Sequence, residues 1–202
     1  MKVIFLDNDG VICLSNNWGS RHKKQKEWIK GGGTTMIKDM PVEYRFDNFD
    51  VKAIKVLNSI LITTGAEIVV SSDWRLHATL EELGEYYTSK GIIKKPIDVT
   101  ERFHYTNWEA EGRVATDFPW NRTDGLEQER HFEIKEWLKN HPEVTHWVAV
   151  DDLNMGVHME KTAWGEPYDR SWGLENFVLT PSSREGIKQS GIKEKILKYL
   201  AE

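Results

Sequence analysis

Cysteine is almost absent from this chain, because its 202 residues include a single one, Cys13. One cysteine cannot form an internal disulfide and is typical of a protein in a reducing compartment, so we expect a cytoplasmic location. The seven histidines show no metal-ligand spacing with it, which excludes the familiar zinc patterns. Surface or core positions are the expectation for them.

Long apolar runs are also missing, since no stretch approaches the roughly 20 residues of a membrane span. Asp7 and Asp9 interrupt the first apolar segment too early for a signal peptide. A membrane is therefore not among the expected partners. The content of 39% hydrophobic and 29% charged residues is typical of a soluble globular protein. We expect one domain over 1–202, with small insertions at about 13–48 and 92–127.

A general excess of positive charge is absent as well, because the net charge is −5. The chain as a whole therefore lacks the electrostatic pattern of a nucleic-acid-binding protein. The exception is the segment 21–30, RHKKQKEWIK, with five Lys or Arg and one Glu. A solvated helix face or loop is the favoured interpretation, and a local attractor for a phosphorylated substrate is the alternative.

Apolar strands and amphipathic helices alternate along the sequence. Strands are expected at 3–6, 66–72, 146–152 and 176–180, and helices at 50–65, 76–91 and 127–142, with closing helical turns in 184–202. Asp50 suits an N-cap and Gly65 a helix stop. The segments 13–46 and 96–127 are expected to be irregular. This order predicts an α/β Rossmann-like three-layer sandwich with a mostly parallel sheet.

Polar side chains follow three of these strands at their ends. They are Asp7 and Asp9, Ser71 and Ser72, and Asp151 and Asp152. Each pair alone could be an ordinary turn. Ligands of parallel sheets bind at the carboxyl ends of strands, so the three pairs together indicate a site. Four carboxylates repel one another unless a cation neutralises them, and oxygen ligands alone favour Mg²⁺.

These segments resemble the motifs of the haloacid dehalogenase (HAD) superfamily of phosphohydrolases. VIFLDNDGV (3–11) resembles its first motif, IVVSSDWR (68–75) its second and WVAVDD (147–152) its fourth. The third motif is a basic residue in the preceding helix, for which Arg130 fits and Lys135 is the weaker option. The SSDWR and RHFEIKEWL segments also resemble small HAD domains associated with nucleic-acid repair and with phage proteins.

The resemblance implies a Mg²⁺-dependent phosphatase that works through an aspartyl-phosphate. Asp7 would be the nucleophile and Asp9 the general acid and base. Ser71 and Arg130 would hold the phosphoryl group. The further phosphate-binding candidates are Asn8 and Ser72, and the metal set is Asp7, Asp9, Asp151 and Asp152. An aspartate at the position of Asp9 favours a phosphatase over the superfamily's transport ATPases.

The substrate is the least determined property. The short insertions imply an open site. An approach to it could be lined by Trp18, Trp108, Arg21, Lys23, Lys24 and Lys26. We therefore expect a nucleotide or a nucleic-acid phosphate end, making the protein a nucleotidase or end-processing phosphatase. A small phosphometabolite phosphatase and a non-catalytic phospho-ligand-binding protein are the alternatives, and an oligomer is compatible with the sequence.

The last three residues of the second motif segment are expected to have mainly structural roles. Asp73 suits a cap for the helix that follows, and Trp74 suits the core. Arg75 suits either the site or an ion pair near the helix start.

Overall fold

The computed structural model describes residues 1–102, 125–157 and 173–201, and the side chains of 125–129 lie outside the description. Five strands form one sheet: β1 (Lys2–Leu6), β2 (Glu67–Val70), β3 (Asp98–Val99), β4 (His146–Asp151) and β5 (Phe177–Leu179). Their order is β3-β2-β1-β4-β5 and every pairing is parallel. The expected α/β class and parallel sheet are therefore confirmed.

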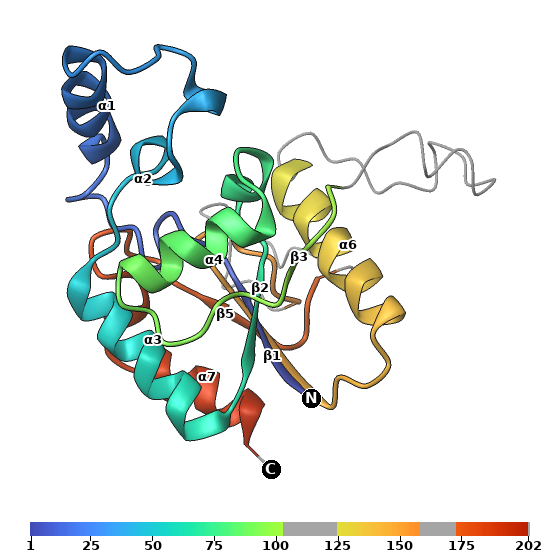
Figure 1. The fold of residues 1–202 in the computed structure, drawn as a ribbon. Helices are drawn as coiled ribbons and strands as arrows, with labels where there is room; N and C mark the ends of the chain where they lie inside the picture. The colour runs from blue at the N-terminus through green and yellow to red at the C-terminus, as the bar shows by residue number, and fades with distance from the viewer. Residues whose placement is uncertain (103–124, 158–172, 202) are drawn as a thin grey trace.

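Alternate residues of the central strand point to opposite faces of the sheet, as the two-residue period of a strand requires. Ile4 and Leu6 join the core under α3 (Val51–Thr64), α4 (Leu80–Ser89) and α7 (Ile192–Leu200). Val3 and Phe5 pack with Ile134 and Trp137 of α6 (Gly125–Asn140) on the other face. Figure 1 shows this sheet between its two helical layers.

Local signals place the ends of α3 where the sequence predicts them. The Asp50 carboxylate accepts hydrogen bonds from the backbone N–H groups of Lys52 and Ala53 at 2.9 Å each. Gly65 ends the helix in the left-handed conformation, at φ 69°. The helix expected at 76–91 is shorter, because a 3-10 turn, η2 (Asp73–Leu76), precedes it and Thr79 caps α4.

The expectation of an irregular segment over 13–46 is wrong in part. This stretch contains α1 (Ser20–Lys30), η1 (Ile37–Asp39) and α2 (Val42–Arg45). No apolar stripe marks α1, since it buries no residue against the core, and this is why hydrophobic periodicity does not predict it. In Figure 1 α1 stands apart from the sheet, beside α2, at the end of the molecule opposite the N-terminus.

The second expected insertion, at 92–127, is described only in part. It contributes β3, the short edge strand, and the first turn of α6. Residues 103–124, which include Trp108, lie outside the described residues. A short 3-10 turn, η4 (Gly186–Lys188), precedes α7 in the C-terminal segment. Among the described helices, none combines the length and apolar character that crossing a membrane requires.

Candidate active site

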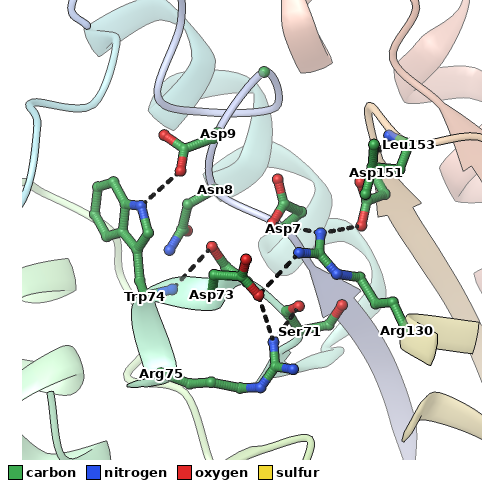
Figure 2. Close-up of polar contacts among 12 residues, drawn as sticks. Asp7, Asn8, Asp9, Ser71, Asp73, Trp74, Arg75, Arg130, Asp151 and Leu153 are labelled. Carbon is green, nitrogen blue, oxygen red and sulfur yellow. Dashed lines mark hydrogen bonds and ion pairs between the residues drawn. The ribbon is translucent and has the colours of Figure 1, made fainter. Parts of the chain in front are cut away.

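Asp7 stands at the carboxyl end of β1 and is 3% exposed. Its Oδ1 accepts a hydrogen bond from Arg130 Nη1 at 3.0 Å, and the same nitrogen donates to Asp151 Oδ2 at 2.8 Å. Arg130 comes from α6 and Asp151 ends β4, so three elements meet at this point (Figure 2). The second nitrogen, Nη2, lies 3.3 Å from Asp73 Oδ1. One guanidinium therefore joins three carboxylates.

Three carboxylates have the arrangement that a hard cation needs. Asp7, Asp151 and Asp152 each offer an oxygen, and these oxygens lie within 4.8 Å of one another. Oxygens bound to Mg²⁺ at about 2.1 Å stand roughly 3 to 4 Å apart, so only small shifts separate the two geometries. The donor set consists of oxygen alone, which suits Mg²⁺ better than a soft metal. These residues therefore fit the ion.

The three carboxylates of this group repel one another. Burial raises the pKa of Asp7 well above its usual value, the Asp151 charge raises it further, and Arg130 opposes both effects. Burial, together with the neighbouring Asp151, raises the pKa of Asp152 to about 6. A single guanidinium thus offsets only part of the repulsion. A divalent cation among these oxygens would favour their charged forms.

The Asp9 side chain is not a member of this group. Its Oδ2 accepts a hydrogen bond from Trp74 Nε1 at 2.8 Å, and Figure 2 shows it turned toward the indole. Burial raises the pKa of Asp9, whereas the hydrogen bond from Trp74 lowers it. A carboxyl group held beside the nucleophile with a raised pKa has the properties of a general acid.

The turn after Asp9 depends on Gly10. This residue has φ 70°, a left-handed conformation that favours glycine, and a Cβ there would lie 2.2 Å from Asp152 Oδ2. The glycine therefore lets the first motif approach the fourth.

The side chain of Asn8 has a structural role. The residue is completely buried, and its Oδ1 accepts a 2.6 Å hydrogen bond from the hydroxyl of Tyr87 in α4. Its backbone oxygen accepts from the N–H groups of Val11, Ile12 and Cys13, which closes the loop after β1. The side-chain oxygen is therefore occupied, whereas the amide Nδ2 of Asn8 is buried without a hydrogen-bond partner among the described residues and, with the backbone N–H, is the donor that Asn8 offers to a phosphate oxygen.

The two serines after β2 have different surroundings. Ser71 is 1% exposed, lies in Figure 2 beside the acidic group, and its backbone oxygen accepts from Arg75 Nη1 at 2.7 Å. The hydroxyl of Ser72 accepts from the backbone N–H of Trp74 at 3.4 Å and caps η2. The expectation that Asp73 caps the helix that follows is wrong, because Thr79 caps α4 and the Asp73 carboxylate faces Arg130.

Arg75 forms a buried ion pair that joins the second motif to α6. Its Nη2 lies 2.5 Å from Glu133 Oε2, and both side chains are 4% exposed. Its Nη1 also lies 3.8 Å from Asp73 Oδ1. Of the two expectations for Arg75, the ion pair is therefore the one that the structure shows. This pair holds the loop that carries Ser71 against the helix that carries Arg130.

The third-motif candidates differ clearly in position. The guanidinium of Arg130 lies among the carboxylates, whereas Lys135 is exposed one and a half turns further along α6. The sequence reasoning missed the contacts of two site residues, Asp73 and Trp74. Trp74 is a core residue as expected, at 6% exposure, but its N–H also reaches Asp9. Their positions two and three residues after Ser71 are the sequence feature that points to these contacts.

A family model for the HAD domain in Swiss Army Knife RNA repair proteins matches residues 3–190. The match spans the three strand-end motifs, α6 and the segment that contains α1. No curated protein and no solved structure matches the chain.

Proposed function

Because the chain belongs to the family of HAD domains found in Swiss Army Knife RNA repair proteins, we propose that it is a Mg²⁺-dependent phosphatase acting on nucleic-acid phosphate ends. The observation that carries the proposal is the buried Asp7 carboxylate at the carboxyl end of β1, grouped with Asp151 and Asp152 and held by Arg130. This is the arrangement that in-line attack on a phosphoryl group needs.

In the first step, an oxygen of Asp7 attacks phosphorus and the bond to the leaving oxygen breaks. Asp9 gives its proton to that oxygen, and an aspartyl-phosphate remains. In the second step, Asp9 takes a proton from water as the water attacks phosphorus. Inorganic phosphate leaves and the Asp7 carboxylate is restored. The raised pKa of Asp9 supports its role as the acid of the first step.

Arg130, Ser71 and the backbone around Asn8 would bind the phosphoryl oxygens. Arg130 keeps its charge throughout. Burial lowers its pKa, but the neighbouring charges of Asp151, Asp7 and Asp73 together raise the pKa above its usual value. Its planar fork suits two oxygens at once. The hydroxyl of Ser72 serves η2, which leaves Ser71 as the better phosphate ligand of the two.

Mg²⁺ would be held by Asp7, Asp152 and the backbone carbonyl of Asp9, with Asp151 in support. Both carboxylate oxygens of Asp151 already accept hydrogen bonds, from Arg130 Nη1 and from the backbone N–H of Leu153 at 2.8 Å. This favours Asp152 as the direct ligand. When bound, the ion would offset the charge of the transferring phosphoryl group.

The test pairs p-nitrophenyl phosphate with a panel of mononucleotides, sugar phosphates and oligonucleotides bearing 3′- or 5′-phosphates. Hydrolysis should require Mg²⁺, stop with EDTA and be lost in Asp7→Asn. Asp39→Asn, which removes an exposed carboxylate in η1, is the matched control and should retain activity. Protein quenched in acid during turnover should carry a phosphoryl group that hydroxylamine releases.

Two outcomes would contradict the proposal. Retained binding of phosphorylated ligands without turnover of any substrate would identify a binding protein instead of an enzyme. A preference for sugar phosphates by orders of magnitude would keep the chemistry and overturn the substrate class.

A further inference from the structure

Helix α1 is a basic element that contributes nothing to the core. Its sequence, SRHKKQKEWIK, contains five Lys or Arg residues and one Glu, and it buries no residue. The whole chain, α1 included, has a net charge of −5. Burial therefore does not explain why this helix is present, and its charge is opposite in sign to that of the whole chain.

One face of α1 packs on the segment that follows it. Lys24 Nζ donates to the backbone oxygen of Phe46 at 2.7 Å, and Gln25 Nε2 donates to the backbone oxygen of Tyr44 at 3.0 Å. The rings of Trp28 and Tyr44 lie 4.9 Å apart. These contacts fix which side of the helix faces the protein.

The opposite face carries a row of lysines. Lys23, Lys26 and Lys30 are exposed, and their spacing of three and four residues puts them on one side of the helix. With a rise of 1.5 Å per residue, the row extends for about 10 Å along the axis. Burial lowers the pKa of the inner Lys24 to about 8, whereas these three ammonium groups stand in solvent.

The segment that precedes α1 contacts the loop that carries Asp9. Asp9 forms an isolated parallel bridge with Cys13, and the backbone oxygen of Cys13 accepts from Trp18 Nε1 at 3.2 Å. Trp18 is 49% exposed although its indole N–H is anchored. Only Gly19 separates this residue from the start of α1 at Ser20. Along the chain, an exposed ring and then three lysines thus lead away from Asp9.

We propose that α1 and Trp18 form the docking surface for a single-stranded nucleic acid whose terminal phosphate enters the active site. This inference rests on the proposed function and extends it to the polymer. A base of the strand stacks on Trp18, and the following phosphodiesters lie along Lys23, Lys26 and Lys30. Positive grooves interleaved with exposed aromatic rings bind single strands in this way. A small phosphometabolite has no charge that could reach the far end of the row.

The test measures binding separately from turnover. Asp7→Asn protein is titrated into single-stranded RNA of about 12 nucleotides, fluorescein-labelled at one end and phosphorylated at the other, and anisotropy is recorded at several salt concentrations. Replacing Lys23, Lys26 and Lys30 by Gln should weaken binding by about 10- to 100-fold and reduce the slope of log K against log salt by about 2. Trp18→Ala should weaken it about 5- to 100-fold.

The matched control replaces Lys52, Lys55 and Lys195 by Gln. These lysines are exposed on α3 and α7, so the control removes equal charge from other surfaces and should leave the affinity unchanged. Circular dichroism verifies that both triple variants are folded. In an Asp7-intact background, the Lys23/Lys26/Lys30 variant should also lower the ratio of kcat/KM for the RNA to kcat/KM for p-nitrophenyl phosphate.

Equal affinities for the two triple variants would overturn the docking surface while leaving the phosphatase proposal intact. Loss of binding to phosphatidylserine vesicles, with unchanged RNA affinity, would assign the lysine row to a lipid surface and also overturn it. Absence of all phosphatase activity would contradict the proposed function, and the anisotropy would still report whether α1 binds RNA.

Discussion

Trp74→Phe should separate substrates by the quality of their leaving group. The indole Nε1 is 2.8 Å from Asp9 Oδ2, and phenylalanine removes this donor while keeping a ring in the stack. In the proposed mechanism Asp9 protonates the leaving oxygen. An oligonucleotide or alkyl phosphate needs that proton, whereas p-nitrophenolate leaves without it. The substitution should therefore slow hydrolysis of oligonucleotide and alkyl phosphates much more than hydrolysis of p-nitrophenyl phosphate.

The magnitude follows from the contact that is lost. A hydrogen bond to a charged group contributes about 1.5 to 3 kcal/mol. If that energy keeps Asp9 in its working position, kcat/KM for poor leaving groups should fall about 10- to 150-fold. For p-nitrophenyl phosphate, kcat/KM should change by less than about threefold. This parameter reports the steps up to departure of the leaving group, and p-nitrophenolate departs without a proton from Asp9.

The control for packing is Phe49→Leu. Phe46 and Phe49 stack on Trp74 with ring centroids 4.4 and 5.2 Å away. Phe49→Leu removes its stack on the indole and the edge contacts of Phe49 with Tyr86 and Tyr87. The loss costs about 1 to 3 kcal/mol of stability, which urea unfolding measures, and leaves the N–H donor of Trp74 in place. Phe49→Leu should therefore affect both substrates alike. An equal loss for both substrates in Trp74→Phe, or no loss at all, would refute the reasoning.

Three further substitutions test other parts of the structure. Gly10→Ala should reduce kcat/KM and destabilise the fold by about 1 to 3 kcal/mol in urea unfolding, because its Cβ would collide with Asp152 at a left-handed φ. Arg130→Lys should lower kcat/KM for p-nitrophenyl phosphate about 10- to 100-fold, since an ammonium cannot replace a fork between carboxylates; a change within twofold would contradict this. The Arg45 side chain and the capping box lower the pKa of Glu82 below its usual value of 4.5. The stabilisation of the fold by ionised Glu82 is therefore complete above pH 4.5, and it is lost as the pH falls through the lowered pKa of the folded protein. Glu82→Gln should therefore cost about 1 kcal/mol near neutral pH and progressively less in acid, as urea unfolding at both pH values will show.

Much of the fold follows from local signals in the sequence. Short apolar runs at 3–6 and 146–151 became the central strands β1 and β4, because strands buried on both faces are continuously hydrophobic. Asp50 and Gly65 defined the ends of α3. The polar pairs after the strands converge because parallel strands share one carboxyl edge.

Elements without a hydrophobic pattern could not be found this way. Helix α1 has no apolar stripe, since its stabilising contacts are hydrogen bonds such as those from Lys24 to Phe46 and Asn48, and one aromatic contact. The 3-10 turn at Asp73–Leu76 is likewise set by the Ser72 cap and not by periodicity.

The sequence alone determined which polar pairs gather at the edge of the sheet, because each pair follows a strand and parallel strands end at the same edge. Only the tertiary structure decided how they pair. Arg130 meets Asp7 across 123 positions of the chain, and Trp74 meets Asp9 across 65. Which of Arg130 and Lys135 faces the acids depends on the rotation of α6, and that rotation is fixed by the burial of Ile134 and Trp137 against the sheet. Such contacts come from packing between distant elements, which local sequence patterns do not encode.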